Sequence, residues 1–126
     1  MINGSKIKPV RLIIAGGRDF QDWDLLCKTL DELVGARELE IEVVSGTARG
    51  ADQLGERWAQ LRGYPVRQFP ADWQQHGKQA GWLRNQQMAQ YATHCVCFWD
   101  SKSRGTGHMI NLAQEQGLNL QVVIWS

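Results

Sequence analysis

The sequence predicts a layered α/β domain in which helices cover both faces of a mostly parallel sheet of about five strands. Five short apolar runs alternate with four stretches of helical periodicity along the chain. Most of these runs are nearly continuously apolar, which is typical of strands that are buried on both faces of a sheet. The length of 126 residues fits one domain that spans residues 1–126.

Each element follows from its local pattern. Strands that are buried in the sheet are predicted at residues 10–15, 41–45, 95–99 and 120–125. A weaker strand at 66–69 suits an edge, because the polar residues Arg67 and Gln68 lie inside it. Helices with apolar residues three or four positions apart are predicted at residues 23–33, 51–62, 77–92 and 106–116. Residues 1–8 are expected to form a flexible tail.

Composition excludes several classes of protein. A hydrophobic content of 43% and a net charge of +1 exclude a disordered chain. No apolar run approaches the roughly 18 residues that a membrane span needs, and the N-terminus lacks the apolar stretch of a signal peptide. We therefore expect a cytoplasmic protein without a membrane partner. The small net charge argues against duplex nucleic acid as a partner.

The three cysteines predict neither a disulfide framework nor a metal site. Their number is odd, and their spacing is not that of a disulfide-rich secreted domain. No pair of His and Cys residues has the spacing of zinc ligands. Cys95 and Cys97 lie two residues apart in an apolar run, so they would share one face of a strand. Buried free thiols are the expected outcome.

Glycines mark one edge of the predicted sheet. Seven of the 13 glycines fall in segments that lead from a strand into a helix, and these are Gly16, Gly17, Gly46, Gly50, Gly77, Gly105 and Gly107. In a parallel sheet such segments meet at the carboxyl edge of the strands, where folds of this class bind ligands. This edge is therefore the predicted binding site.

The first candidate loop places Gly16 and Gly17 before the charged pair Arg18 and Asp19. Glycines let a backbone approach a phosphate, amides at a helix N-terminus donate hydrogen bonds to it, and Arg18 can add a bidentate contact. A tight turn with a solvated Arg–Asp pair is the alternative. The full Gly-x-Gly-x-x-Gly spacing of a dinucleotide fingerprint is missing.

The second candidate loop combines hydroxyls, glycines and charges at a helix start. Its candidate residues are Ser45, Gly46, Thr47, Arg49, Gly50 and Asp52. Such a loop can wrap an anion, but no Gly-Lys-Ser/Thr ends it, so ATP hydrolysis is disfavoured. Asp52 has an alternative role, which is to interact with the helix dipole.

Two further segments supply candidates for an anionic ligand with a ring. The candidates in them are Trp73, Lys78, Arg84, Asn85, Ser103, Gly105, Thr106 and Gly107. Trp73 can stack on a base or form a hydrophobic lid. Lys78 lies close to a predicted helix start, against the preference of the dipole, which suggests an anionic ligand. His108, at the start of another helix, is expected to be a hydrogen-bonding residue.

Five segments spread along the chain carry a family resemblance. They are residues 14–20 and 44–52, Gly77-Lys78, Arg84-Asn85 with Met88, and Gly105-Thr106. Through them the sequence resembles the SLOG superfamily of Rossmann-like nucleotide-binding proteins, especially its small YspA/YpsA-related branch. The resemblance implies a Rossmann-like three-layer sandwich with a pocket for a nucleotide or nucleotide-derived ligand. Because relatives often dimerise, it also implies a homodimer.

One departure from the superfamily affects the expected activity. The related LOG enzymes cleave the base from nucleoside monophosphates, and the resemblance aligns Met109 with their catalytic Glu. A thioether can neither activate water nor stabilise an oxocarbenium-like centre, so LOG-type activity is disfavoured. Asp19 and Asp52 are the candidate catalytic residues that can supply a carboxylate from another loop.

Three functions remain open. The first is binding, in a sensing or sequestering role, of a nucleotide-derived small molecule. The second is hydrolysis of an N-glycosidic or phosphate bond in such a ligand. The third, by resemblance to the DprA branch of the superfamily, is handling of single-stranded nucleic acid, which needs exposed aromatic side chains and cations along a groove.

Overall fold

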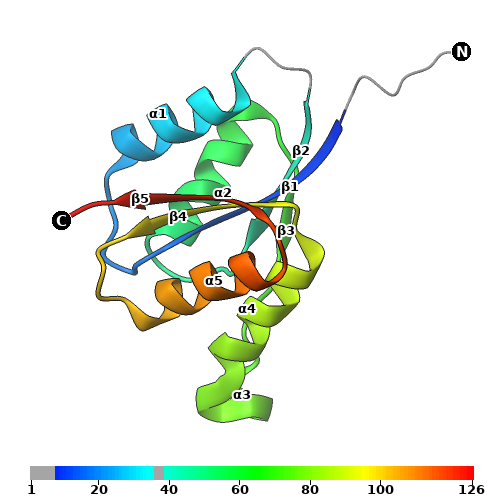
Figure 1. The fold of residues 1–126 in the computed structure, drawn as a ribbon, viewed down its shortest axis with the longest axis vertical. Coiled ribbons are helices and arrows are strands. Elements are labelled where there is room, and N and C mark those ends of the chain that lie inside the picture. Colours follow the sequence, from blue (N-terminus) through cyan, green and yellow to red (C-terminus); the bar gives the residue numbers. More distant parts are fainter. Residues whose placement is uncertain (1–7, 36–38) are drawn as a thin grey trace, which may run out of the picture.

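Five parallel strands form the sheet of the computed structural model, which describes residues 8–35 and 39–126 (Figure 1). The strands are β1 (Lys8–Gly16), β2 (Leu39–Ser45), β3 (Val66–Gln68), β4 (His94–Trp99) and β5 (Asn119–Ile124). Their order across the sheet is β3-β2-β1-β4-β5, and every neighbouring pair is parallel. This confirms the predicted class of fold.

Helices cover both faces of the sheet, as predicted. They are α1 (Trp23–Val34), α2 (Ala51–Arg62), α3 (Trp73–His76), the short 3₁₀ helix η2 (Gly77–Gln79), α4 (Ala80–Tyr91) and α5 (Arg104–Glu115). Buried residues of α1 and α2 pack on one face, and buried residues of α4 and α5 pack on the other. Figure 1 shows α3 and the start of α4 projecting beyond the sheet. Within the described ranges, no helix has the length and apolarity to cross a bilayer.

The alternation of side chains along β1 creates two hydrophobic cores. Leu12 and Ile14 point towards α1 and α2, where they join the fully buried Trp58. Ile13 and Ala15 join the cluster formed with α4 and α5. Because both faces of this central strand are covered, its sequence is apolar at every position from 12 to 15.

Close packing of α2 on the sheet depends on a glycine, and the burial of Cys95 and Cys97 follows the expectation. Gly55 of α2 lies against β1, where a Cβ would come within 2.9 Å of Ile14. Cys95 and Cys97 are buried free thiols on one face of β4, with their Sγ atoms 3.5 Å apart. The glycine therefore lets a helix approach the sheet, while the two thiols fill core space.

The predicted helix over 77–92 is wrong at its start, because two local signals break it. The Asp72 carboxylate accepts the Gln75 backbone N–H at 3.1 Å and begins the short helix α3 at Trp73. Gly77 then ends α3 with a φ of +55°, and α4 begins only at Ala80. Lys78 therefore lies in η2, between two helices.

Other boundaries differ by one or two residues, and two of these differences concern predicted residues of the site and of the tail. The Ser103 hydroxyl accepts the Thr106 N–H at 3.4 Å, so α5 begins at residue 104 rather than 106, and Gly105 and Gly107 lie inside the helix. At the N-terminus, β1 begins at Lys8, which removes that residue from the predicted tail. Residues 1–7 of the tail lie outside the described residues.

Strand β5 is an edge strand and not the buried strand that its composition predicts. Among the described strands it pairs only with β4, whereas the predicted edge strand β3 occupies the opposite edge. Leu120 packs into the core beside α5, but Val122 and Ile124, further along the same face, are 37% and 61% exposed. An apolar run predicts a strand, but whether that strand lies at the centre or at an edge of the sheet depends on the topology.

Candidate functional site

The strand order places a crevice at the carboxyl ends of β1 and β4. The chain moves outwards from β1 to β2 and β3 and then crosses back to β4, so the loops after β1 and β4 diverge. Ligands of open α/β sheets bind at such a switch point. A cavity of about 550 Å³ lies there, which we call the large cavity.

Most of the predicted site residues line the large cavity. They are Gly16, Gly17, Arg18, Asp19, Asp52, Trp73, Lys78, Arg84, Asn85, Ser103, Gly105 and Thr106. Gly46, Thr47 and Arg49 instead line an adjacent cavity of about 240 Å³, which we call the small cavity. Four residues, Arg18, Ala48, Trp73 and Arg84, line both cavities and thus form their shared wall.

Three predicted residues, Ser45, Gly50 and Gly107, line neither cavity. The Ser45 hydroxyl donates to Glu56 Oε2 at 2.6 Å and accepts the Thr47 N–H at 3.1 Å, so it shapes the second loop. Gly107 faces Trp99, whose ring would lie 3.5 Å from a Cβ at position 107. These contacts are structural.

Gly50 holds the first two loops together. Its φ is +89°, and a Cβ there would overlap the carbonyl oxygen of Gly17 and lie 2.7 Å from that of Arg18. Only glycine fits this position. The Ala51 N–H, at the start of α2, also donates to the Gly17 carbonyl oxygen at 3.4 Å. The two loops therefore form one packed floor beneath the large cavity.

A buried carboxyl and a guanidinium lie side by side in the site. Asp52 is 7% exposed, and burial raises its pKa to about 6, although the Ala48 N–H, 3.1 Å from Oδ2, and the positive charge of Arg84 both favour the ionised form. Burial also lowers the pKa of Arg84. A Cβ at Gly46 would lie 2.8 Å from both Arg84 Nη1 and Asp52 Oδ2, so this glycine leaves room for the pair.

Arg84 is held in place by hydrogen bonds to neutral groups. Its Nη1 donates to the Gly46 carbonyl oxygen and its Nε donates to Asn85 Oδ1 at 2.9 Å. In the described part of the chain, no carboxylate lies within ion-pair distance of Arg84, Arg18 or Lys102, while Arg49 pairs with Asp19 at 3.6 Å. The positive charges that line the large cavity are therefore available to an anion.

Hydrogen bonds to Asp100 order the loop that leads from β4 to the N-terminus of α5. Asp100 Oδ1 accepts the backbone N–H groups of Lys102 and Ser103 at 2.9 and 2.8 Å, and these bonds lower the pKa of Asp100. Ser101 has a φ of +68°, a left-handed conformation that few non-glycine residues adopt. Thr47, in the second loop, has a φ of +64°. Such backbone conformations concentrate at functional sites.

Aromatic rings complete the walls of the large cavity. The Trp82 and His108 rings lie 3.8 Å apart between centroids, and His108 Nδ1 is 3.3 Å from Asn85 Nδ2, in keeping with the hydrogen-bonding role expected for His108. Burial lowers the pKa of His108, so its ring is neutral at pH 7. Trp73 and Trp82 are 53% and 54% exposed. The exposed sides of these two rings are available for stacking, whereas the other side of Trp82 contacts His108.

Several lining residues were not predicted as site residues, and they are Ala48, Gly81, Trp82, Asp100, Lys102, His108, Met109 and Trp125. Trp82 stands in a polar stretch, which indicates an exposed ring of the kind that the single-stranded nucleic-acid hypothesis expects. Trp125 follows the last strand and reaches the site only because β5 lies beside β4, with Trp99 opposite Ile124. Among residues 8–35 and 39–126, no cluster of three His, Cys, Asp or Glu side chains could hold a metal ion.

Comparisons with known proteins agree with this fold. The chain is similar to the Gene 61 protein of Mycobacterium phage D29, with 36% identity over 114 residues, which cover 86% of this chain and 91% of that protein. It also superposes on DNA processing protein A (DprA) from Streptococcus pneumoniae with a TM-score of 0.73 and 17% identity, over 94% of this chain. The chain spans about half (51%) of DprA, and this likeness establishes the fold alone.

The family assignment rests on the first half of the molecule. A family model described as YspA, cpYpsA-related SLOG matches residues 10–76, which run from β1 through both floor loops to the end of α3. The resemblance inferred from the motifs is thereby confirmed. The chain belongs to the YspA, cpYpsA-related SLOG family.

Proposed function

We propose that the large cavity binds a nucleotide or a nucleotide-derived small molecule, in a sensing or sequestering role. The observation that carries this proposal is that cations and aromatic rings line the same cavity. The cations are Arg18, Arg84 and Lys102, which lack an ion-pair partner among the described residues, and the rings are those of Trp73 and Trp82. Guanidinium and ammonium groups match phosphate oxygens, and indole faces match a base. The volume of about 550 Å³ suits a small molecule.

The N-terminus of α5 supports the same assignment. Gly105 and Thr106 lie in its first turn and line the large cavity, and Lys102 precedes them. Backbone amides at a helix start and the helix dipole both favour a phosphate. We therefore expect the phosphate to lie among the N-terminus of α5, Arg18 and Arg84, with the base towards Trp82.

Calorimetric titration with a panel of nucleoside mono-, di- and triphosphates tests the proposal. Arg18→Ala and Lys102→Ala should each weaken the best ligand by about 10- to 100-fold, because each removes a charge-assisted contact. Lys28→Ala is the control, since this exposed lysine of α1 lines neither cavity and its loss should leave the affinity unchanged. The absence of binding across the panel would refute the proposal.

Hydrolysis of an N-glycosidic or phosphate bond is a second candidate, and Asp52 is the observation in its favour. Its carboxyl is buried, lines the large cavity and has a pKa of about 6, so it can exchange a proton near neutral pH. Asp19 is the weaker catalytic candidate because its side chain is 91% exposed. Met109, buried in the core beside the cavity, supplies no carboxylate.

Chromatography of nucleotides after incubation with the protein tests this second candidate. Turnover should disappear in Asp52→Asn and persist in Asp19→Asn. Intact substrates at high protein concentration would exclude hydrolysis of that panel while leaving binding open.

Single-stranded nucleic acid is a third candidate ligand, which the exposure of Trp73 and Trp82 favours. A net charge of +1 provides little general attraction for a polyanion. A gel-shift assay at low salt with a short oligonucleotide should show no retention if the site is specific for small molecules.

We also propose that the chain forms a homodimer through the free edge of β5. Residues 119–126 carry no charged side chain, and Val122 and Ile124 are exposed on one face of the strand. Edge strands that do not associate are usually protected by charges, and an antiparallel pairing of two β5 strands has the two-fold symmetry of a dimer. Light scattering should report a dimer for the native chain and a monomer for Val122→Lys.

A further inference from the structure

The small cavity is too small to be a ligand site by itself. Its volume of about 240 Å³ lies below the roughly 300–1000 Å³ that is typical of small-molecule sites. It adjoins the large cavity across the shared wall of Arg18, Ala48, Trp73 and Arg84. The small cavity is therefore best understood as an extension of the large one, which accommodates a second part of the same ligand.

The shared wall carries two positive charges. Burial is the main cause that lowers the pKa of Arg84, and the positive charge of Arg18 lowers it further, against the opposing effect of Asp52. The hydrogen bonds of Arg84 go to the Gly46 carbonyl oxygen and the Asn85 amide oxygen, both of them neutral acceptors. An anion at this wall relieves the repulsion between the two guanidinium groups, and phosphate matches guanidinium geometry.

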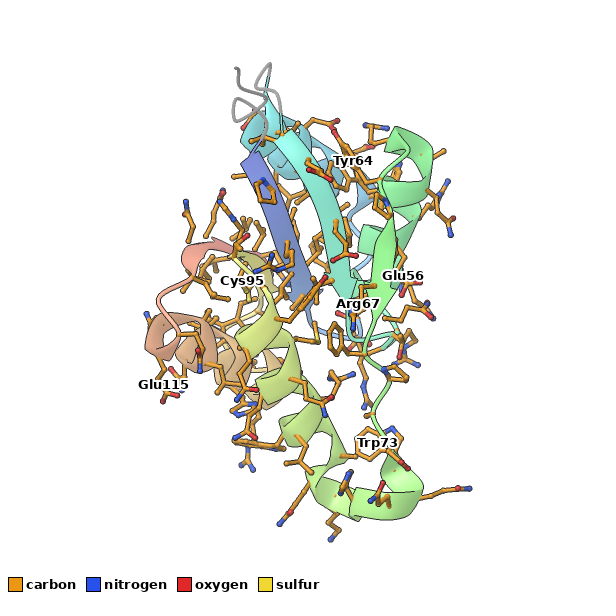
Figure 2. All side chains as sticks on the ribbon, turned by 90° about the vertical axis from the view of Figure 1, so that its right-hand side faces the viewer. Glu56, Tyr64, Arg67, Trp73, Cys95 and Glu115 are labelled. Atoms are coloured by element: carbon orange, nitrogen blue, oxygen red, sulfur yellow. The ribbon has the colours of Figure 1, made fainter. Side chains whose placement is uncertain are left out.

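The two cavities differ in chemistry. The large cavity is lined by Trp82 and His108, whose rings are tilted by 40° to each other, and the half-exposed Trp82 ring suits a flat base. The small cavity is lined by Thr47, Arg49, Pro70 and Ala71, and Trp73 of the shared wall is the aromatic residue that borders it. Figure 2 shows Trp73 on α3, between the chain that follows β3 and helix α4. A polar, non-aromatic unit of about the size of a sugar fits this lining.

We infer that the ligand has two units, a nucleoside in the large cavity and a second, sugar-sized polar unit in the small cavity, joined by phosphate at the Arg18–Arg84 wall. This inference rests on the proposed binding function and narrows its ligand class. It makes the phosphate a linker between the two units, and it gives Trp73 the role of a divider between them.

Matched ligand pairs test the inference by calorimetry. Each pair compares a nucleoside diphosphate with the same diphosphate carrying a sugar, namely ADP with ADP-ribose and UDP with UDP-glucose. The two-unit member should bind about tenfold more tightly in at least one pair, although it carries less negative charge. Electrostatic attraction alone predicts the opposite order.

Two substitutions locate the added affinity. Ala71→Leu fills part of the small cavity and should remove the tenfold advantage while leaving the affinity for the nucleoside diphosphate unchanged. Gln74→Leu is the matched control, because Gln74 is exposed on α3 and lines neither cavity, and it should preserve the advantage. A thermal melt of each variant verifies that it folds.

Three outcomes would overturn the inference. If the members of each pair bind equally, or if Ala71→Leu weakens both members alike, the two-unit ligand is wrong and the proposed nucleotide site stands. If no member of any pair binds, the proposed function fails, and the inference fails with it.

Discussion

Asp52→Asn should change how the stability of the protein depends on pH. The Asp52 carboxyl is 7% exposed, and its pKa rises from 3.8 to about 6 on folding. A shift of about 2 units corresponds to about 3 kcal/mol, since each unit corresponds to about 1.4 kcal/mol. The wild-type chain therefore carries a buried ionised group at neutral pH, and that group disfavours folding.

The direction of the effect follows from proton linkage. Well below pH 3.8 Asp52 is protonated in both the folded and the unfolded chain, and its contribution to stability is fully present. As pH rises from about 4 to about 6, the unfolded chain releases this proton first, and the free energy of unfolding decreases by about 3 kcal/mol. Above the folded pKa of about 6, this contribution is fully lost and no longer changes.

Urea unfolding at a series of pH values, followed by circular dichroism, measures the effect. The difference in unfolding free energy between wild type and Asp52→Asn should fall by about 3 kcal/mol from pH 3.5 to 7, because the amide does not titrate. Asp19→Asn removes a negative charge at the same edge of the sheet, but from an exposed side chain, and controls for net charge. A difference that stays constant with pH would refute the burial argument for Asp52.

Three further predictions concern the floor loops, a helix start and the anion site. Gly50→Ala should lower the unfolding free energy, measured in urea, by at least twice the roughly 1 kcal/mol expected for Gly63→Ala. Both glycines have a positive φ, but only a Cβ at Gly50 would overlap backbone atoms. Equal losses in the two variants would contradict the packing described for Gly50. Ser103→Ala should lower the unfolding free energy by about 1 kcal/mol through loss of the α5 cap, and Ser103→Asp should restore it. Sulfate keeps a constant charge from pH 5 to 7 and should bind more weakly as pH rises, because Asp52 ionises. Calorimetry should find a shallower pH profile in Asp52→Asn, in which His108 of the same cavity can still titrate.

The fold was predictable because the central strands record their environment in the sequence. β1 and β4 are covered on both faces, so their buried positions are almost all apolar. The segments that follow these strands are instead rich in glycine and charged residues. The loop residues that face the cavities could be named for the same reason, since parallel topology brings the carboxyl ends of the strands together.

The remaining features depend on tertiary contacts that no local pattern contains. The exposure of Ile124 follows from the absence of a strand beyond β5 among the described residues, and its own composition suits burial equally well. Trp82 and His108 meet only when α4 and α5 pack together. The break before α4 did have local signals in Asp72 and Gly77, but helical periodicity in the following residues concealed them.

The two floor loops, which are packed around Gly50, and helix α3 should differ in how readily each moves away from the cavities. Gly50 and Gly17 hold the two loops together, so the conformational entropy of the floor is lost when the chain folds rather than when a ligand arrives. Helix α3 buries none of its residues and can separate from the body at a small cost in free energy. A ligand should therefore reach the cavities by displacing Trp73, and its binding should slow amide hydrogen exchange in α3 far more than in the floor loops.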